Sequence, residues 1–286
     1  MNYSISSSKF GNGLLKGLLQ ELSKYFKSKE VPFYVIGATA RDIVIRQFLD
    51  QESSRRTRDL DIAIAIPDWD KYEEISTEIA NLEHFQKSSN QKQRFYYCEV
   101  YELDIVPFGK VAKGNEHIYW PPEEEVAMSV QGFDEALKNF MTVRVDDEFD
   151  IRITSLSGLF LLKLNAWMDR HGETGKDAED LYYILDKYYD VFEDRNRERD
   201  YHQEVYDLVD FDIFVVGAIW LGYDIEKILS KEQIRFYNSI ITSELSLKED
   251  SVLINQMLKQ NGLAKYDVLY KALSELSSIL GNALNH

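Results

Sequence analysis

Three aspartates carry the clearest chemical signal in this sequence. Asp59 and Asp61 flank Leu60 at the start of an apolar run that is typical of a β-strand. Because strand side chains alternate between faces, the two carboxylates point the same way, while Leu60 points into the protein. A third carboxylate, Asp104, lies near the end of another strand-like run, 95–106, which a neighbouring position in the sheet would bring beside the first two. Carboxylate oxygens grouped in this way favour Mg²⁺ held jointly with substrate phosphates.

The segment before these aspartates has features of a phosphate-binding turn. A short apolar strand, 33–36, leads into Gly37, and residues 40–48 have the pattern of a helix. Amides in the first turn of such a helix attract anions, and the small residues Gly37 and Ala38 let a nucleotide approach the backbone. An ordinary strand-to-helix turn is the alternative interpretation of this stretch.

A second group of candidate residues lies on two predicted helices, 156–168 and 176–188. Lys163 falls inside the apolar first helix, where it either extends its amine to the surface or is held there for a function. On the second helix, the three-residue spacing of Asp177 and Asp180 places them on one face. Either carboxylate could reach an active site, or both could belong to an exposed set of helical ion pairs.

The order of these motifs resembles the polymerase-beta-like nucleotidyltransferase superfamily. In that superfamily a helix-opening Gly-Gly or Gly-Ser precedes the Asp-x-Asp strand and a later single Asp; this chain has Gly37-Ala38-Thr39. Arg41-Asp42 is similar to the Arg-Asp found after the glycines in the head domains of tRNA nucleotidyltransferases. The segments LLKLNAWMDR (161–170) and KDAEDLYYIL (176–185) resemble the third and fourth motifs of AbiEii-type toxins of bacterial type IV toxin–antitoxin systems.

The resemblance implies a nucleotidyltransferase of the EC 2.7.7 type with two metal ions, Mg²⁺ or alternatively Mn²⁺. Asp59 and Asp61 would hold one ion on the triphosphate, and with Asp104 they would hold a second about 3.5–4 Å away. Lys163 joins the three aspartates as a catalytic residue because its charge would offset that of the triphosphate. The nucleotide-binding residues implied by the match are Gly37, Ala38, Thr39, Arg41, Lys163, Asp177 and Asp180.

Element order and composition predict the fold. Strands alternate with helices up to about residue 155, so we expect an α/β (α+β) catalytic domain at 1–154, with a mixed sheet flanked by helices. A helical domain at 155–286 is expected to complete the nucleotide site. The single cysteine, Cys98, and the absence of a signal-peptide pattern favour a cytoplasmic protein. The longest nearly apolar run, 213–223, is about half of the ~20 residues needed to span a bilayer, so no membrane segment is expected.

The distribution of charge suggests an acceptor. The chain has a net charge of −16, yet residues 1–58 carry ten Lys or Arg against five Asp or Glu. This basic segment, with Arg55, Arg56 and Arg58 directly before the aspartate strand, favours a polyanion as acceptor, an RNA 3′ end such as that of tRNA. The toxin resemblance adds the expectation of a partner antitoxin protein. The alternative is that the lysines form the solvated face of one helix.

Two other functions remain open at this point. One is a catalytically weak module that binds NTP or RNA for regulation, and the other is a small-molecule, antibiotic-type nucleotidyltransferase. The histidines show no zinc-ligand spacing, and the sequence contains neither a serine nucleophile motif nor a Walker lysine loop.

Overall fold

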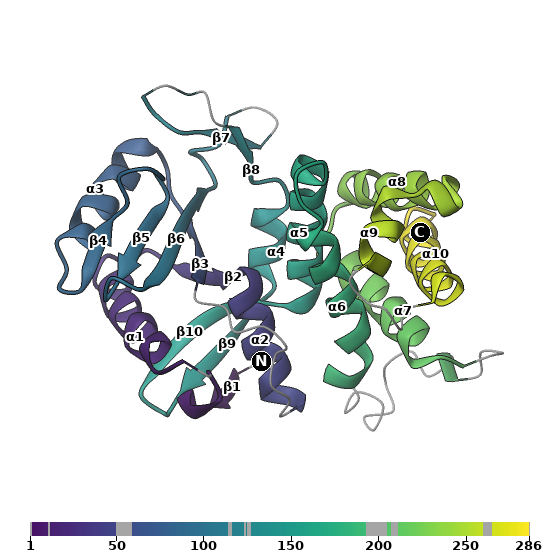
Figure 1. Ribbon diagram of the computed structural model, residues 1–286, viewed down its shortest axis with the longest axis horizontal. Coiled ribbons are helices and arrows are strands. Elements are labelled where there is room, and N and C mark those ends of the chain that lie inside the picture. Colours follow the sequence, from purple (N-terminus) through teal and green to yellow (C-terminus); the bar gives the residue numbers. More distant parts are fainter. Residues whose placement is uncertain are drawn as a thin grey trace. The chain divides into compact units, whose positions relative to one another are not determined.

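The computed structural model describes residues 2–10, 12–49, 59–113, 116–122, 124, 127–192, 205–206, 211–259 and 265–285. The chain divides into two compact units, Met1–Ser155 and Leu156–His286, and each is described by itself (Figure 1). The three arginines at 55, 56 and 58, which the sequence places before the aspartate strand, lie outside the described residues.

A mixed sheet forms the centre of the first unit. Among the described residues it has eight strands in the order β1-β9-β10-β2-β3-β6-β5-β4, with β3 and β6 parallel and β2 and β3 antiparallel. Its strands are β1 (Asn2–Ile5), β2 (Phe33–Ile36), β3 (Asp59–Ala65), β4 (Phe85–Lys87), β5 (Arg94–Tyr97), β6 (Tyr101–Phe108), β9 (Phe140–Val145) and β10 (Phe149–Thr154). The predicted α/β class with a mixed sheet is confirmed. A separate ribbon pairs β7 (His117–Tyr119) with β8 (Ala127–Ser129).

Helices α1 (Gly13–Ser28), α2 (Gly37–Leu49), α3 (Trp69–Ala80) and α4 (Phe133–Lys138) accompany this sheet. Helix α1 begins after Asn12, whose side-chain oxygen accepts a hydrogen bond from the Leu14 amide at 3.0 Å. Helices α1 and α3 lie side by side, since the Tyr25 hydroxyl of α1 donates to the Glu78 carboxylate of α3 at 2.7 Å. Together they bury apolar stripes, as the three-and-four spacing of their leucines and isoleucines predicts.

The predicted single strand 95–106 is wrong. The structure divides this stretch into β5 and β6, which pair antiparallel across a tight turn at Cys98 and Glu99. These two residues have φ values of 50° and 64°, the left-handed conformation that hairpin turns usually give to Asn and Gly. Neither Cys nor Glu is common in tight turns, and the alternation of buried side chains continues past the turn. The sequence pattern therefore gives no signal that the chain reverses here.

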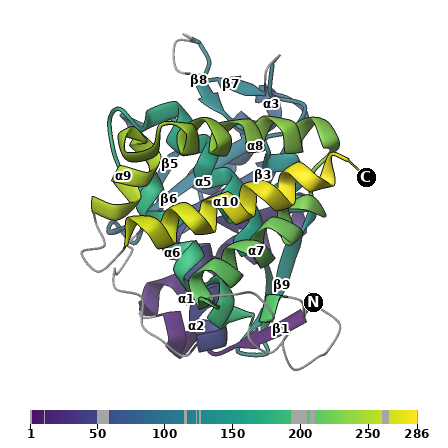
Figure 2. The ribbon, with the colours of Figure 1, turned by 90° about the vertical axis from the view of Figure 1, so that its right-hand side faces the viewer.

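The second unit is helical, as predicted. Its helices are α5 (Leu156–Arg170), α6 (Lys176–Val191), α7 (Ile213–Glu226), α8 (Lys231–Ser246), α9 (Val252–Lys259) and α10 (Tyr266–Ala283). Helix α10 runs between α7 and α8 (Figure 2). Residues 215–222 of the apolar run are buried within α7, where Trp220 has no exposed surface, whereas Ile213 at the start of the helix is 49% exposed. Within the described ranges, no helix has both the length and the apolar character that a bilayer crossing demands.

Candidate active site

The aspartates come together on two neighbouring strands. Strands β3 and β6 pair in parallel, with Asp61 opposite Asp104 and Asp59 opposite Glu102. Residues paired across parallel strands project on the same side of the sheet, so all four carboxylates share one face. Asp59 is exposed, and Asp61 and Asp104 are half-buried. The expected placement of Asp104 on a strand adjoining the Asp-x-Asp strand is thus observed.

Gly37 brings the backbone against this group of carboxylates. It opens α2 directly after β2, three residues earlier than the predicted start of the helix. Its φ is +67°, which side chains disfavour. A Cβ at this position would also lie 2.2 Å from the Asp61 Oδ2 atom, so glycine is required by both conformation and space. The start of α2 and the Asp61 carboxylate are therefore in direct contact.

Replacing Gly37 by alanine is expected to lower the free energy of unfolding by about 1–3 kcal/mol, because the residue would be strained and the Asp61 carboxylate displaced. Mn²⁺ binding should weaken in the same variant. Thermal melting and metal titration measure the two effects. Gly13→Ala is the matched control, since a Cβ at Gly13 meets nothing within 4 Å. Equal stability and metal binding in the two variants would contradict this role for Gly37.

Thr39 fixes the first turn of α2 to the aspartate strand. Its hydroxyl donates a 2.8 Å hydrogen bond to the backbone carbonyl of Asp59. Ala38, beside it, is half-exposed and leaves the backbone of this turn accessible. The buried Tyr101 lies close by; burial raises the pKa of its hydroxyl to about 12, and the nearby Asp59 carboxylate acts in the same direction.

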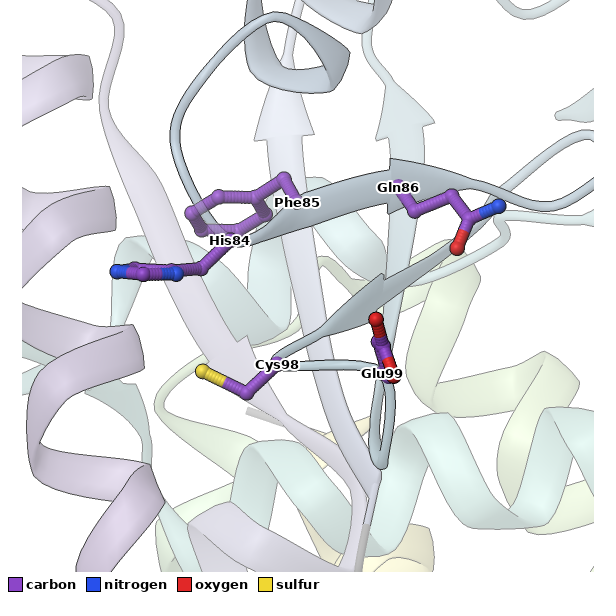
Figure 3. Close-up of a pocket in the computed structure, with 5 residues that line it drawn as sticks. All are labelled: His84, Phe85, Gln86, Cys98 and Glu99. Carbon is purple, nitrogen blue, oxygen red and sulfur yellow. The ribbon is translucent and has the colours of Figure 1, made fainter.

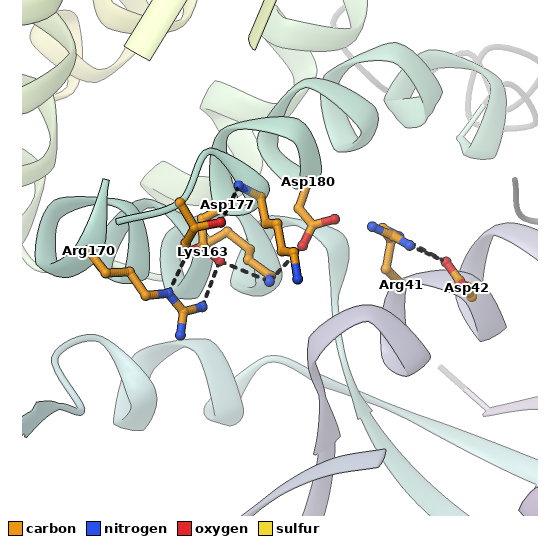
Figure 4. A network of polar contacts seen from close by, with 8 residues as sticks. Arg41, Asp42, Lys163, Arg170, Asp177 and Asp180 are labelled. Atoms are coloured by element: carbon orange, nitrogen blue, oxygen red, sulfur yellow. Dashed lines mark hydrogen bonds and ion pairs between the residues drawn. The ribbon is translucent and has the colours of Figure 1, made fainter. Parts of the chain in front are cut away.

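Arg41, expected to bind the nucleotide, is buried and bound to its neighbour Asp42. Its Nε and Nη2 atoms donate to Asp42 Oδ1 at 2.9 and 2.7 Å (Figure 4). Both side chains are only 7% exposed. A buried pair of this kind orders the first turns of α2, and any contact of Arg41 with phosphate would have to compete with Asp42.

Arg94 is a residue of this site that no sequence pattern indicates. It lies on β5 directly opposite Asp104, and its Nε and Nη2 atoms donate to Asp104 Oδ1 and Oδ2, each at 2.8 Å. Its Nη1 atom lies 2.6 Å from Glu102 Oε2. Hydrogen bonding to Asp104 raises the pKa of Arg94 above its ordinary value, so the guanidinium stays charged. Because the sequence pattern of 95–106 predicts one continuous strand, it gives no signal of this cross-strand pair.

The carboxylates fit a hard cation only in part. Asp59 and Asp61 offer the oxygen ligands that Mg²⁺ prefers, from alternate positions of one strand. Among the residues that the structure describes, however, no three His, Cys, Asp or Glu side chains are grouped so as to hold a metal ion. Asp104, the predicted third ligand, is instead bound at both oxygens by Arg94.

In the second unit, Lys163 binds two of the predicted carboxylates. Its Nζ atom lies 3.1 Å from Asp177 Oδ1 and 2.6 Å from Asp180 Oδ2 (Figure 4). Arg170 donates to both oxygens of Asp177 at 2.7 and 2.9 Å. The Asp177 side chain is 1% exposed, so an exposed set of helical ion pairs is the wrong interpretation. Burial alone would lower the pKa of Lys163, but Asp180 and Asp177 raise it above its ordinary value.

This cluster should make the second unit sensitive to acid. Burial acts to raise the pKa of Asp177, but Arg170 and Lys163 overcome it and hold that pKa below the ordinary value of 3.8. A depressed pKa stabilises the folded state above the unfolded-state value, and this stability is lost as the pH falls through the folded-state value. Wild type should therefore lose stability between about pH 5 and pH 2 more steeply than Asp177→Asn. Urea unfolding across this pH range measures the loss of stability, with Asp186→Asn as the control because the Asp186 side chain is 38% exposed. Parallel curves for wild type and Asp177→Asn would contradict the prediction.

A cavity of about 340 Å³ lies elsewhere in the first unit. Its lining residues are His84, Phe85, Gln86, Cys98 and Glu99, at the turn between β5 and β6 and at the start of β4 (Figure 3). None of the predicted site residues lines it. The amide of Cys98 donates to the His84 carbonyl at 2.8 Å, so the walls of the cavity are joined through the backbone.

Several solved structures are distantly similar to this chain, and two of them are described here. No family model and no curated protein matches the chain. An antigenic nucleotidyltransferase-like protein from Paracoccidioides brasiliensis is 15% identical, with a TM-score of 0.41 over 71% of this chain and 93% of that one. The antibiotic-resistance factor ANT(2'')-Ia is 12% identical, with a TM-score of 0.33 over 66% of this chain and 96% of that one. At such TM-scores neither likeness carries an argument about function, and the AbiEii resemblance stays a prediction.

Proposed function

We propose that the chain is a metal-dependent nucleotidyltransferase that moves NMP from an NTP to an acceptor hydroxyl. The observation that carries this proposal is the register of β3 and β6, which sets Asp61 beside Asp104 on the same face as Asp59. The contact of Gly37 with Asp61 adds a helix start next to the carboxylates. A helix N-terminus for phosphate and adjacent carboxylates for a divalent cation are the two parts that transfer from a triphosphate requires.

In the proposed reaction, the first turn of α2 binds the β- and γ-phosphates through the backbone of Gly37 and the turn that Thr39 fixes. Asp59 and Asp61 would hold Mg²⁺, which when bound neutralises phosphate charge and lowers the pKa of the acceptor hydroxyl. Asp104 accepts the hydroxyl proton on a carboxylate oxygen. The hydroxyl oxygen then bonds to the α-phosphorus, the bond from that phosphorus to the bridging oxygen breaks, and pyrophosphate leaves.

The proposal extends to the second unit through Lys163, with Asp177 and Asp180 as further nucleotide-binding residues. Two observations support these roles. Segments 161–170 and 176–185 resemble the toxin motifs, and the two aspartates keep the Lys163 amine charged. In the described structure that charge is already balanced by carboxylates, so a triphosphate would have to compete for it.

We further propose that the acceptor is an RNA 3′ end, that of tRNA, and that the activity is toxin-like with a cognate antitoxin. Support comes from the basic first 58 residues and from the AbiEii resemblance. The test is to incubate the protein with each radiolabelled NTP and total cell extract, then treat the products with RNase or protease. Label removed by RNase supports RNA, and label removed by protease alone contradicts it. Label that resists both enzymes identifies a small-molecule acceptor.

One observation favours the second candidate, a catalytically weak NTP- or RNA-binding module. Arg94 occupies both oxygens of Asp104, the residue that would accept the proton. Binding of NTP with Mg²⁺ but no labelled product in the extract experiment would support this alternative, whereas product formation that depends on Asp59 and Asp61 supports the transferase.

A further inference from the structure

Asp104 lies between an acidic side chain on one adjoining strand and a basic side chain on the other. Strand β6 lies between β3 and β5, so Asp104 has Asp61 on one side and Arg94 on the other. Its two oxygens are both bound by Arg94 at 2.8 Å, in the planar two-bond geometry that an arginine and a carboxylate form best. Asp104 is 17% exposed and Arg94 20%, so water weakens this pair only in part.

The third nitrogen of the guanidinium is engaged as well. Arg94 Nη1 lies 2.6 Å from the Glu102 carboxylate, two residues before Asp104 on the same strand. Arg94 thus binds the two acidic side chains of β6 whose partners on β3 are Asp59 and Asp61. On the β5 side, the Arg94 guanidinium balances the negative charge of these carboxylates. A bound cation would do the same on the β3 side.

Two roles for Arg94 are physically distinct. A residue that orients a metal ligand would hold Asp104 where it completes the ligand set, and its loss would weaken metal binding. A competitor would hold Asp104 out of that set, and its loss would strengthen metal binding. The described residues contain no assembled group of three metal-ligand side chains while Arg94 holds Asp104, which favours competition.

Building on the function proposed above, we propose that Arg94 is a positioning residue that withholds Asp104 from the metal site until a divalent cation displaces its guanidinium. Asp104 would then join Asp59 and Asp61 in holding the cation, while the Arg94 guanidinium keeps its second partner, Glu102. Metal affinity in the absence of nucleotide is set by this exchange, so the wild-type protein binds divalent cations more weakly than its carboxylates alone would allow.

The experiment is Mn²⁺ binding without nucleotide, followed by calorimetry and by the electron paramagnetic resonance signal of free Mn²⁺. Arg94→Gln should tighten Mn²⁺ binding about tenfold. Arg94→Lys, which keeps the charge but not the planar fork, should tighten it about threefold and serves if the glutamine variant fails to fold. The matched control is Arg144→Gln: Arg144 also pairs with a carboxylate on this sheet, Asp150 at 3.2 Å, and the substitution changes the net charge equally. It should leave the affinity unchanged.

A double-mutant cycle separates exchange from long-range electrostatics. Asp104→Asn should weaken Mn²⁺ binding more in the Arg94→Gln background than in wild type, because only the freed Asp104 contributes fully to binding. Equal losses in the two backgrounds, or an Arg94→Gln affinity at or below that of wild type, would overturn the inference. Failure of the proposed function is distinguishable: there, Asp61→Asn would leave Mn²⁺ binding unchanged in every background.

Discussion

Replacing Asp61 with asparagine is expected to lower the rate of nucleotidyl transfer on the order of a thousandfold while leaving the protein at least as stable as wild type. Asp61 is central to the site, with Asp104 opposite it on β6 and Gly37 against its carboxylate. Loss of its charge removes a ligand from the proposed cation. It also relieves repulsion between neighbouring carboxylates, which commonly stabilises a site.

Single-turnover transfer assays and thermal melting test this prediction together. Asp70→Asn is the matched control, because Asp70 is an exposed aspartate in the first turn of α3 in the same unit. It should retain the wild-type rate. A wild-type rate in Asp61→Asn would remove this residue from the mechanism, and a large fall in melting temperature would indicate a structural role for its carboxylate.

The second large effect is expected for Lys163→Ala, which should lower the free energy of unfolding by about 3 kcal/mol. The substitution leaves the Asp180 carboxylate without its 2.6 Å partner and leaves Asp177 with Arg170 alone. Asp177 is 1% exposed and Asp180 11%, so water cannot replace the lost ammonium. If Lys163 only bound triphosphate, as the sequence suggests, Lys163→Ala would change the stability little. Because Lys163 pairs with buried carboxylates, we expect a large loss of stability.

Urea unfolding of the wild type and Lys163→Ala measures this effect. Lys187→Ala is the control on the same unit, since Lys187 pairs with the more exposed Asp186 and should cost less than about 1 kcal/mol. Equal unfolding energies for the two variants would contradict a structural role for Lys163. The triple variant Lys163→Ala, Asp177→Asn, Asp180→Asn should recover part of the lost stability, because it removes the buried charges as well.

Short-range patterns were sufficient to predict much of the fold and the aspartate site. The alternation after Asp59 predicted the strand and the common face of Asp59 and Asp61, since strand geometry has a fixed period of two. The leucines at positions 15, 18 and 22 have the three-and-four spacing of an amphipathic helix, and the structure has α1 there. The apolar stretches 141–145 and 149–153, separated by Asp146 and Asp147, likewise indicate a hairpin, and β9 and β10 form it.

Contacts that depend on register and helix packing could not be predicted in this way. Arg94 lies opposite Asp104 because the chain reverses at two residues that rarely form turns. When a reversal of this kind is not predicted, the residues that pair across the two strands cannot be predicted either. Spacing along α6 placed Asp177 and Asp180 on one face, but which side chain meets that face is set by how α5 packs on α6. The sequence therefore identified Lys163 as unusual without identifying its partners.

The most direct test of the central claim is a calorimetric titration of the purified protein with each NTP, in the presence and in the absence of Mg²⁺. At least one NTP should bind in a Mg²⁺-dependent manner, and Asp61→Asn should lose this dependence while Asp70→Asn keeps it. Absence of Mg²⁺-dependent binding for every NTP would contradict both the transferase and the NTP-binding module.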